Sequence, residues 1–172
     1  MSRLASAVIG LSIVLSFAAA EPAPAADGAA PAAARTTVSL PQGYRSWRHV
    51  KSMIIEPGHA LAALVEGTHH VYANEQAMRG YAKRPFPDGA IIVFDLFATV
   101  KGDQAITDGP RKAVIVMQKD AKRFAATGGW GYEVFANGKP DAPQVRDGAR
   151  EACHACHLAQ KDRDFVFSDY RD

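Results

Sequence analysis

Residues 90–100, with the sequence AIIVFDLFATV, are the stretch that decides the fold. Its even-numbered positions, from Ala90 through Phe94 to Val100, are all apolar, whereas the odd-numbered positions include Asp95 and Thr99. Alternation with a period of two predicts a β-strand that has one buried face and one mixed face, as antiparallel sheets commonly show.

Further strands are predicted on both sides of this stretch, because short apolar runs there are bounded by glycine and proline. These strands cover residues 47–55, 68–73, 112–117 and 130–136. Short helices are predicted at residues 59–65, 75–83, 120–126 and 149–160, with a polar loop at residues 101–110. Strands that follow one another without regular βαβ alternation indicate an α+β fold, an antiparallel β-sheet with flanking short helices.

The chemistry is concentrated in the predicted C-terminal helix, which reads Cys153-His154-Ala155-Cys156-His157 and holds both cysteines of the chain. This is the C-x-x-C-H pattern of c-type haem attachment. Two thiols one helical turn apart can add to the two vinyl groups of one macrocycle, and the following imidazole can ligate the iron. We therefore predict one covalent haem c, bound through Cys153 and Cys156 with His157 as the iron ligand.

Three other interpretations of the motif fit the sequence less well. A disulfide between Cys153 and Cys156 would close a small strained loop. A thioredoxin-like dithiol needs a βαβ unit around the motif, and only sixteen residues follow Cys156. A structural zinc site needs further ligands, and the sequence offers no second pair at metal-binding spacing.

The sequence leaves the second axial position of the iron without a clear protein ligand. The candidates upstream are Met53, Met78 and Met117, although methionines on strands and helices are more often core residues. If none binds, the iron keeps an open position at which a small gas can bind.

The N-terminus has the pattern of an export signal, with Arg3, an uncharged apolar run and a small-residue site ending at Ala20. We predict a signal peptide at residues 1–20, with Ala26 as the alternative cleavage site and a membrane anchor as the alternative interpretation. Residues 21–36 are Ala/Pro-rich and are predicted to be a disordered linker. Residues 37–172 are then a single haem domain in the periplasm, with no membrane span after cleavage.

The formal net charge of +2 comes from interspersed acids and bases, and no basic run suggests nucleic acid as a partner. Three further histidines, His49, His59 and His154, are predicted to lie at the surface. Trp130 and Tyr132 are predicted to pack in the core or against the macrocycle.

An ordered set of motifs between Pro41 and Arg171 resembles the cytochrome P-460 and cytochrome c′-beta family. The motifs are PQGY at 41–44 with Trp47, HVYAN at 70–74, FPDG at 86–89, TGGWGY at 127–132, the cysteine motif at 153–157 and DFVFS at 164–168. The resemblance implies a mostly antiparallel sheet, a homodimer, and a five-coordinate haem ligated by the motif histidine.

The resemblance also places the residues of the distal pocket. One branch of the family oxidises hydroxylamine and carries a haem-linked lysine and a distal carboxylate, whereas the c′-beta branch binds nitric oxide beneath aromatic side chains. The lysine position falls on Phe94 in this sequence, the carboxylate position on Ile115, and a distal arginine position on His69. Both polar functions of the enzyme branch are thus replaced by apolar residues.

The leading functional expectation is therefore the binding of nitric oxide or a similar small gas, without enzymatic turnover. Oxidation of hydroxylamine or nitric oxide is the alternative, with His69 as the one candidate base in the pocket. A third reading is an electron-transfer cytochrome with a periplasmic redox partner and a ligand such as Met53 or Met117.

Overall fold

The computed structural model describes residues 37–148 and 150–171. The predicted signal peptide at residues 1–20 and the predicted linker at residues 21–36 lie outside the described residues, so both stay predictions. No helix in the described part of the chain combines the length and the hydropathy that crossing a membrane requires.

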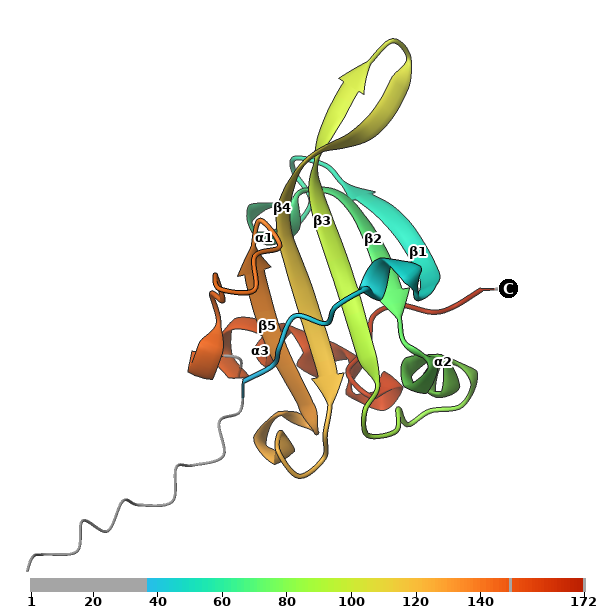
Figure 1. The fold of residues 1–172 in the computed structure, drawn as a ribbon, viewed down its shortest axis with the longest axis vertical. Coiled ribbons are helices and arrows are strands. Elements are labelled where there is room, and N and C mark those ends of the chain that lie inside the picture. Colours follow the sequence, from blue (N-terminus) through green and yellow to red (C-terminus); the bar gives the residue numbers. More distant parts are fainter. Residues whose placement is uncertain (1–36, 149, 172) are drawn as a thin grey trace, which may run out of the picture. The chain divides into compact units, whose positions relative to one another are not determined.

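The core of the fold is a five-stranded sheet in which each strand pairs antiparallel with its sequence neighbour (Figure 1). Its strands are β1 (Arg48–Ile55), β2 (Gly67–Ala73), β3 (Ile91–Gly102), β4 (Ala105–Lys119) and β5 (Trp130–Ala136). The short helices α1 (Ala62–Val65), α2 (Glu75–Ala82) and α3 (Ala155–His157) flank it. The predicted α+β fold with an antiparallel sheet is confirmed.

Asn74 begins α2 as a capping residue and ties this helix to the central strand. Its side-chain oxygen accepts hydrogen bonds from the backbone of Ala77 at 2.9 Å and of Ile91 at 3.0 Å, and its amide donates to the carbonyl of Gly89. A side chain that accepts from the first helical turn satisfies a backbone donor that would otherwise lack a partner. The predicted helix start at Asn74 is confirmed.

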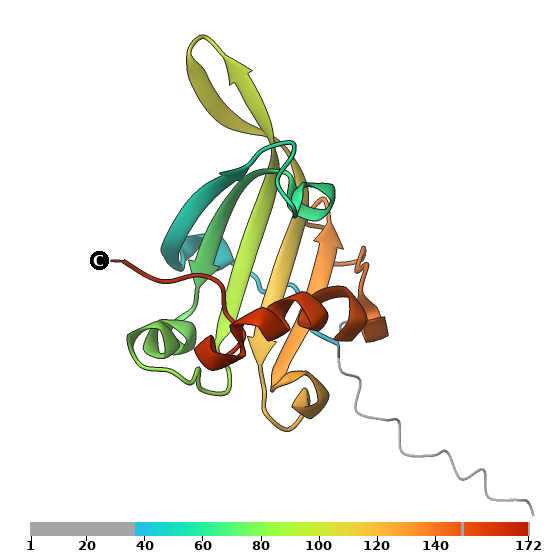
Figure 2. The same ribbon diagram turned by 180° about the vertical axis from the view of Figure 1, so that it is seen from behind.

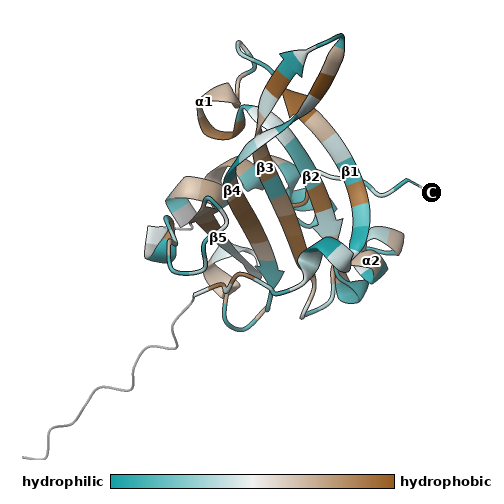
Figure 3. Ribbon diagram, turned by 45° about the horizontal axis from the view of Figure 1, so that its top comes forward, coloured by the Kyte–Doolittle hydropathy of each residue, from teal (hydrophilic) through white to brown (hydrophobic). Residues whose placement is uncertain are grey.

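Both faces of the sheet are covered, and Figure 3 shows hydrophobic residues along the central strands β3 and β4. Residues 37–47, including the 3-10 turn η1 (Tyr44–Ser46), cross one face (Figure 1). The C-terminal segment, residues 150–171, crosses the other (Figure 2), which we call the motif face. On the second face of the central strand, predicted to be mixed, Val93 and Asp95 are fully buried whereas Ile91 and Thr99 are half-buried, so this face is covered to a large extent as well.

The prediction of a polar loop at residues 101–110 is wrong. Strands β3 and β4 form a long hairpin that pairs as far as Gly102 and Ala105. Asp103 and Gln104, at its tip, both have positive φ, at 49° and 57°. Two consecutive residues with positive φ make the tight turn whose twist matches that of paired strands, so the chain reverses here without a loop.

The predicted helix at residues 120–126 is a series of turns that ends in a 3-10 turn, η2 (Ala125–Thr127). Asp120 accepts hydrogen bonds from the backbone of Lys122 and Arg123 and so stabilises the turn locally. Gly128 and Gly129, which both have positive φ, follow directly and end the segment, so the chain turns into β5 without forming a regular helix.

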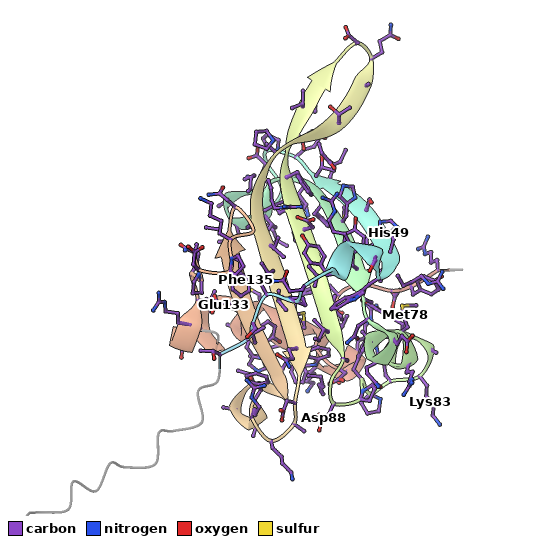
Figure 4. All side chains as sticks on the ribbon, viewed as in Figure 1. His49, Met78, Lys83, Asp88, Glu133 and Phe135 are labelled. Atoms are coloured by element: carbon purple, nitrogen blue, oxygen red, sulfur yellow. The ribbon has the colours of Figure 1, made fainter. Side chains whose placement is uncertain are left out.

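The loop that leads into the motif is fastened to β5 by a buried carboxylate. Glu133, labelled in Figure 4, is 2 % exposed and accepts hydrogen bonds from the backbone of Gln144, Val145 and Arg146 at 2.8–3.1 Å. A buried carboxylate is tolerated here because backbone N–H groups replace the hydrogen bonds that it would make with water. Glu133 thereby fixes the path of the chain shortly before Cys153.

Candidate haem site

The cysteine motif lies on the C-terminal segment, which crosses the motif face (Figure 2). The predicted helix at residues 149–160 is in fact a π-helical turn at Arg150–His154, then α3, then a 3-10 segment at Leu158–Arg163. Cys153 is half-buried, Cys156 is exposed, and the two thiols are free. Burial, with smaller contributions from Glu133 and Cys156, raises the pKa of Cys153 to about 11. A reactive dithiol needs a lowered thiol pKa, so this environment does not favour the thioredoxin-like reading.

His157 is held in the orientation that an iron ligand needs. Its Nδ1 lies 2.6 Å from the backbone carbonyl oxygen of Phe165. A carbonyl can only accept a hydrogen bond, so Nδ1 carries the proton and Nε2 keeps its lone pair free for a metal. The imidazole packs between the rings of Tyr132 and Phe167, with both centroids 5.0 Å from its own.

The charge state of His157 also suits a ligand. Burial is the largest influence and lowers the pKa of the imidazole, and the nearby His154 acts in the same direction. The hydrogen bond to Phe165 opposes them, but the net direction is downward. A neutral imidazole is the form that coordinates iron.

The three predicted distal residues share the motif face. His69 alternates along β2 with Val71 and Ala73, which belong to the core cluster beneath the C-terminal segment. Phe94 pairs with Val71 on one side and with Ile115 on the other, so all of these side chains point to the same face. The rings of His69 and Phe94 are stacked, with centroids 3.9 Å apart and planes 21° from parallel.

The middle of the motif face has apolar side chains that the protein itself covers only partly. Phe94, Ile115 and Val134 form a row across three strands and are all half-buried. The row nearer the C-terminal segment, formed by Ile92, Met117 and Tyr132, is buried. A partly covered apolar strip on the same face as the cysteine motif is a surface that a flat apolar macrocycle can bury. The residues present therefore fit a haem.

His69 contributes a buried polar atom without a partner. The residue is 1 % exposed, and its Nδ1 has no hydrogen-bond partner among the described residues. Burial, followed by the charges of Lys51 and His70, lowers its pKa to about 4. His69 is thus neutral near pH 7 and has an unused hydrogen-bonding position, as expected for a group that faces a bound molecule.

Tyr132 is the second such residue, and its ring packs against His157, the predicted iron ligand. It is 2 % exposed, its hydroxyl has no hydrogen-bond partner among the described residues, and burial raises its pKa. Trp130 is fully buried two residues earlier on the same face. The prediction that Trp130 and Tyr132 pack in the core is confirmed.

The structure keeps two of the candidate methionines on the motif face. Met53 is the register partner of His69 and is 40 % exposed, and Met117 is the partner of Ile92 and is buried. Met78 packs from α2 against the same core cluster. Side chains of paired residues lie on one face, so a methionine as sixth ligand stays an open alternative.

Of the histidines predicted to lie at the surface, His49 and His59 are exposed, but His154 is 7 % exposed and packs near Tyr132 and Phe165. Sequence reasoning also missed the roles of Lys119 and Asp164, which form an ion pair largely shielded from water; Asp164 directly precedes Phe165, whose carbonyl contacts His157. Because 45 residues separate them in the sequence, no local pattern indicates this pair.

Within residues 37–148 and 150–171, no three His, Cys, Asp or Glu side chains lie close enough together for the structural zinc site that was the third alternative interpretation of the motif.

A comparison with protein-family models matches residues 41–168 to the model described as Cytochrome P460. The match extends from the PQGY motif to Ser168 and includes the cysteine motif and the three residues predicted to be distal. A search of curated proteins gave no match.

Proposed function

The chain belongs to the cytochrome P460 family and is a c-type haem cytochrome, and from this we propose that it binds nitric oxide or a similar small gas. We propose one haem, covalently attached through Cys153 and Cys156, with His157 as the proximal ligand. A haem held in this way would supply an iron that can bind a diatomic ligand. Phe94, Ile115 and His69 would line that distal side.

The observation that carries the proposal is the stack of His69 on Phe94, on the same face as the cysteine motif. By the resemblance described above, Phe94 and Ile115 fall where the enzyme branch of the family has its lysine and its carboxylate. An apolar aromatic wall favours small ligands of low polarity, because it offers few hydrogen bonds to a polar substrate.

The environment of His69 argues against the alternative of hydroxylamine oxidation. Such a reaction needs a base, and an effective base has a pKa near the working pH. The pKa of His69 is lowered to about 4, which leaves the imidazole a weak proton acceptor near pH 7. The same neutral imidazole can still hydrogen-bond to a bound gas through its unused Nδ1.

The test is spectroscopy of the full chain, produced in a host that has c-type haem maturation machinery. We expect high-spin ferric and ferrous absorption bands, a spectral change on titration of the ferrous protein with nitric oxide, and haem that stays with the chain after denaturation. Turnover of hydroxylamine would instead favour the enzyme. Low-spin bands that do not respond to nitric oxide would favour electron transfer with Met53 or Met117 as ligand.

We further propose that the protein is a periplasmic homodimer. Beyond Ala98 the hairpin of β3 and β4 extends past the pairing range of β2 and β5, as a two-stranded ribbon at the top of Figure 1. Isolated ribbons of this kind are barely stable in water, and Val100 and Ile106 on it are 48 % and 52 % exposed. A second copy of the chain would cover these side chains through a two-fold interface.

Light scattering coupled to size-exclusion chromatography checks the dimer. The full chain is expected to elute with twice the mass of one chain, and Val100→Lys with Ile106→Lys is expected to shift it to monomer. A Leu64→Lys variant, which changes an exposed leucine on α1, is the control and should stay dimeric. A wild-type monomer would reject the proposal.

A further inference from the structure

The chain leaves its last helical turn through two consecutive residues in the left-handed conformation. Asp164 has φ of 52° and Phe165 has φ of 62°. Neither is glycine, and a left-handed conformation is unfavourable for a residue with a side chain. A conformation of this kind persists only where surrounding contacts compensate for it, so the contacts of Asp164 explain why it is adopted.

Asp164 is fixed by hydrogen bonds from three separate parts of the fold. Its carboxylate accepts from Lys119 Nζ at 2.7 Å, and from the backbone N–H of Phe86 at 2.8 Å. Its backbone carbonyl accepts from the indole Nε1 of Trp130 at 2.9 Å. The end of β4, the loop before β3 and the start of β5 therefore all hold this one residue.

The ion pair between Lys119 and Asp164 is shielded from water. Their side chains are 8 % and 11 % exposed. Lys119 also donates to the carbonyl of Gly128 and lies 5.1 Å from the centre of the Trp130 ring. The attraction between two charges in such surroundings is screened little, so it holds both side chains firmly in place. Removal of one partner leaves the charge of the other uncompensated.

The residue that Asp164 positions is the one that contacts the proximal histidine. The N–H of Phe165 donates to the carbonyl of Gln160 at 2.8 Å, and its own carbonyl accepts from His157 Nδ1 at 2.6 Å. Both bonds depend on the left-handed turn. Hydrogen bonds to the far nitrogen of a ligating histidine set its orientation and its basicity toward the metal.

We propose that Asp164, held by Lys119 and Trp130, is a positioning residue that sets the strength of the bond between His157 and the iron. Asp164 acts through the carbonyl of Phe165 and touches neither the iron nor a distal ligand. The inference rests on the haem ligation of the proposed function, but not on nitric oxide as the physiological ligand.

The variants that test this are Asp164→Asn and Asp164→Ala. Asparagine tolerates the left-handed conformation and can accept from Phe86, but it loses the charge pair with Lys119. Alanine loses every side-chain contact and adds strain. The control is Asp169→Ala, which removes a carboxylate of the same C-terminal segment that pairs with Arg84 and Arg163 at the surface.

The readouts are the iron–histidine stretching band in the resonance Raman spectrum of the ferrous protein and the reduction potential. A weaker hydrogen bond makes the imidazole a poorer donor to iron. The band is therefore expected to shift to lower frequency and to broaden, and the potential to rise, in the order wild type, Asp164→Asn, Asp164→Ala. Asp169→Ala should match the wild type. If the alanine variant does not fold, the asparagine variant carries the test.

Two outcomes would overturn the inference. One is a folded Asp164→Asn protein whose Raman band and potential both match the wild type, because the ion pair would then only tie the chain to the sheet. The other is an equal shift in Asp169→Ala. A wild-type protein that fails to bind nitric oxide, while its potential still shifts in the Asp164 variants, would reject the proposed function and keep this inference.

Discussion

Phe94→Ala is expected to increase the association rate of nitric oxide with the ferrous protein by roughly 10- to 100-fold. Phe94 stacks on His69 and forms part of the apolar strip on the motif face. If its ring must move aside before a ligand reaches the iron, the barrier includes the loss of its packing. Phe94 is half-buried by the chain itself, and a bound haem would cover the rest of its ring. Full burial of a phenylalanine side chain contributes about 1.5–3 kcal/mol, and each 1.4 kcal/mol of barrier changes a rate about tenfold.

Stopped-flow mixing with nitric oxide, or laser-flash photolysis of the nitric oxide complex, measures this rate. Val93→Ala is the matched control, because Val93 is the preceding residue, is fully buried, and packs in the core on the opposite face. It should lower stability without changing the association rate. Phe94→Leu provides a smaller truncation and should give an intermediate rate. Rates for Phe94→Ala and Val93→Ala that both match the wild type would show that Phe94 is ordinary core.

The alternation of residues 90–100 predicted the face on which Phe94 lies, and the structure agrees. Alternation is a local property, since neighbouring side chains of a strand point to opposite sides whatever the rest of the fold does. The same property predicted a common face on β2 for His69, Val71 and Ala73. The pairing of β2 with β3 places these three side chains on the same face of the sheet as Phe94. The cysteine motif was equally local, because its chemistry depends on spacing within five residues.

The missed hairpin shows where local signals mislead. Residues 101–110 are polar and contain glycine and proline, which usually indicates a loop. Asp103-Gln104 is an uncommon pair for a tight turn that needs two positive φ values, where Asn-Gly or Asp-Gly is typical. The ribbon beyond the sheet has few neighbours within the chain, so no burial pattern marks it as strand either.

The second face of β3 and the support of His157 could not be predicted, because both depend on partners far away in the sequence. The alternation pattern places Asp95 on a mixed face, yet Asp95 is buried through contacts with Tyr44 and Arg111. Asp164 was noted only as part of a motif, and its role depends on Lys119, 45 residues away. Charged residues read as surface residues until the partner that compensates them is known.

The buried carboxylate of Asp95 gives the second large prediction. Asp95 is 0 % exposed and accepts from Arg111 through both oxygens, at 2.7 Å from Nε and 3.1 Å from the second guanidinium nitrogen. The hydroxyl of Tyr44 donates to the same carboxylate at 2.8 Å. Burial, followed by this hydrogen bond, raises the pKa of Tyr44, and the pairing with Asp95 raises the pKa of Arg111. The cluster joins residues 37–47 to the central strands.

Asp95→Ala is therefore expected to lower the free energy of unfolding by about 3–5 kcal/mol, because it leaves Arg111 without its charge partner and Tyr44 without its acceptor. Urea denaturation of the holoprotein, followed by circular dichroism, measures the change. Asp108→Ala breaks the more exposed pair with His70 and should lower it by less than about 1 kcal/mol. Because Asp95 lies on the face opposite the motif, the haem absorption spectrum of the folded variant should not change. A loss as small as that of Asp108→Ala would mean that the cluster contributes little to stability, and an altered haem spectrum would mean that the two faces of the sheet are coupled.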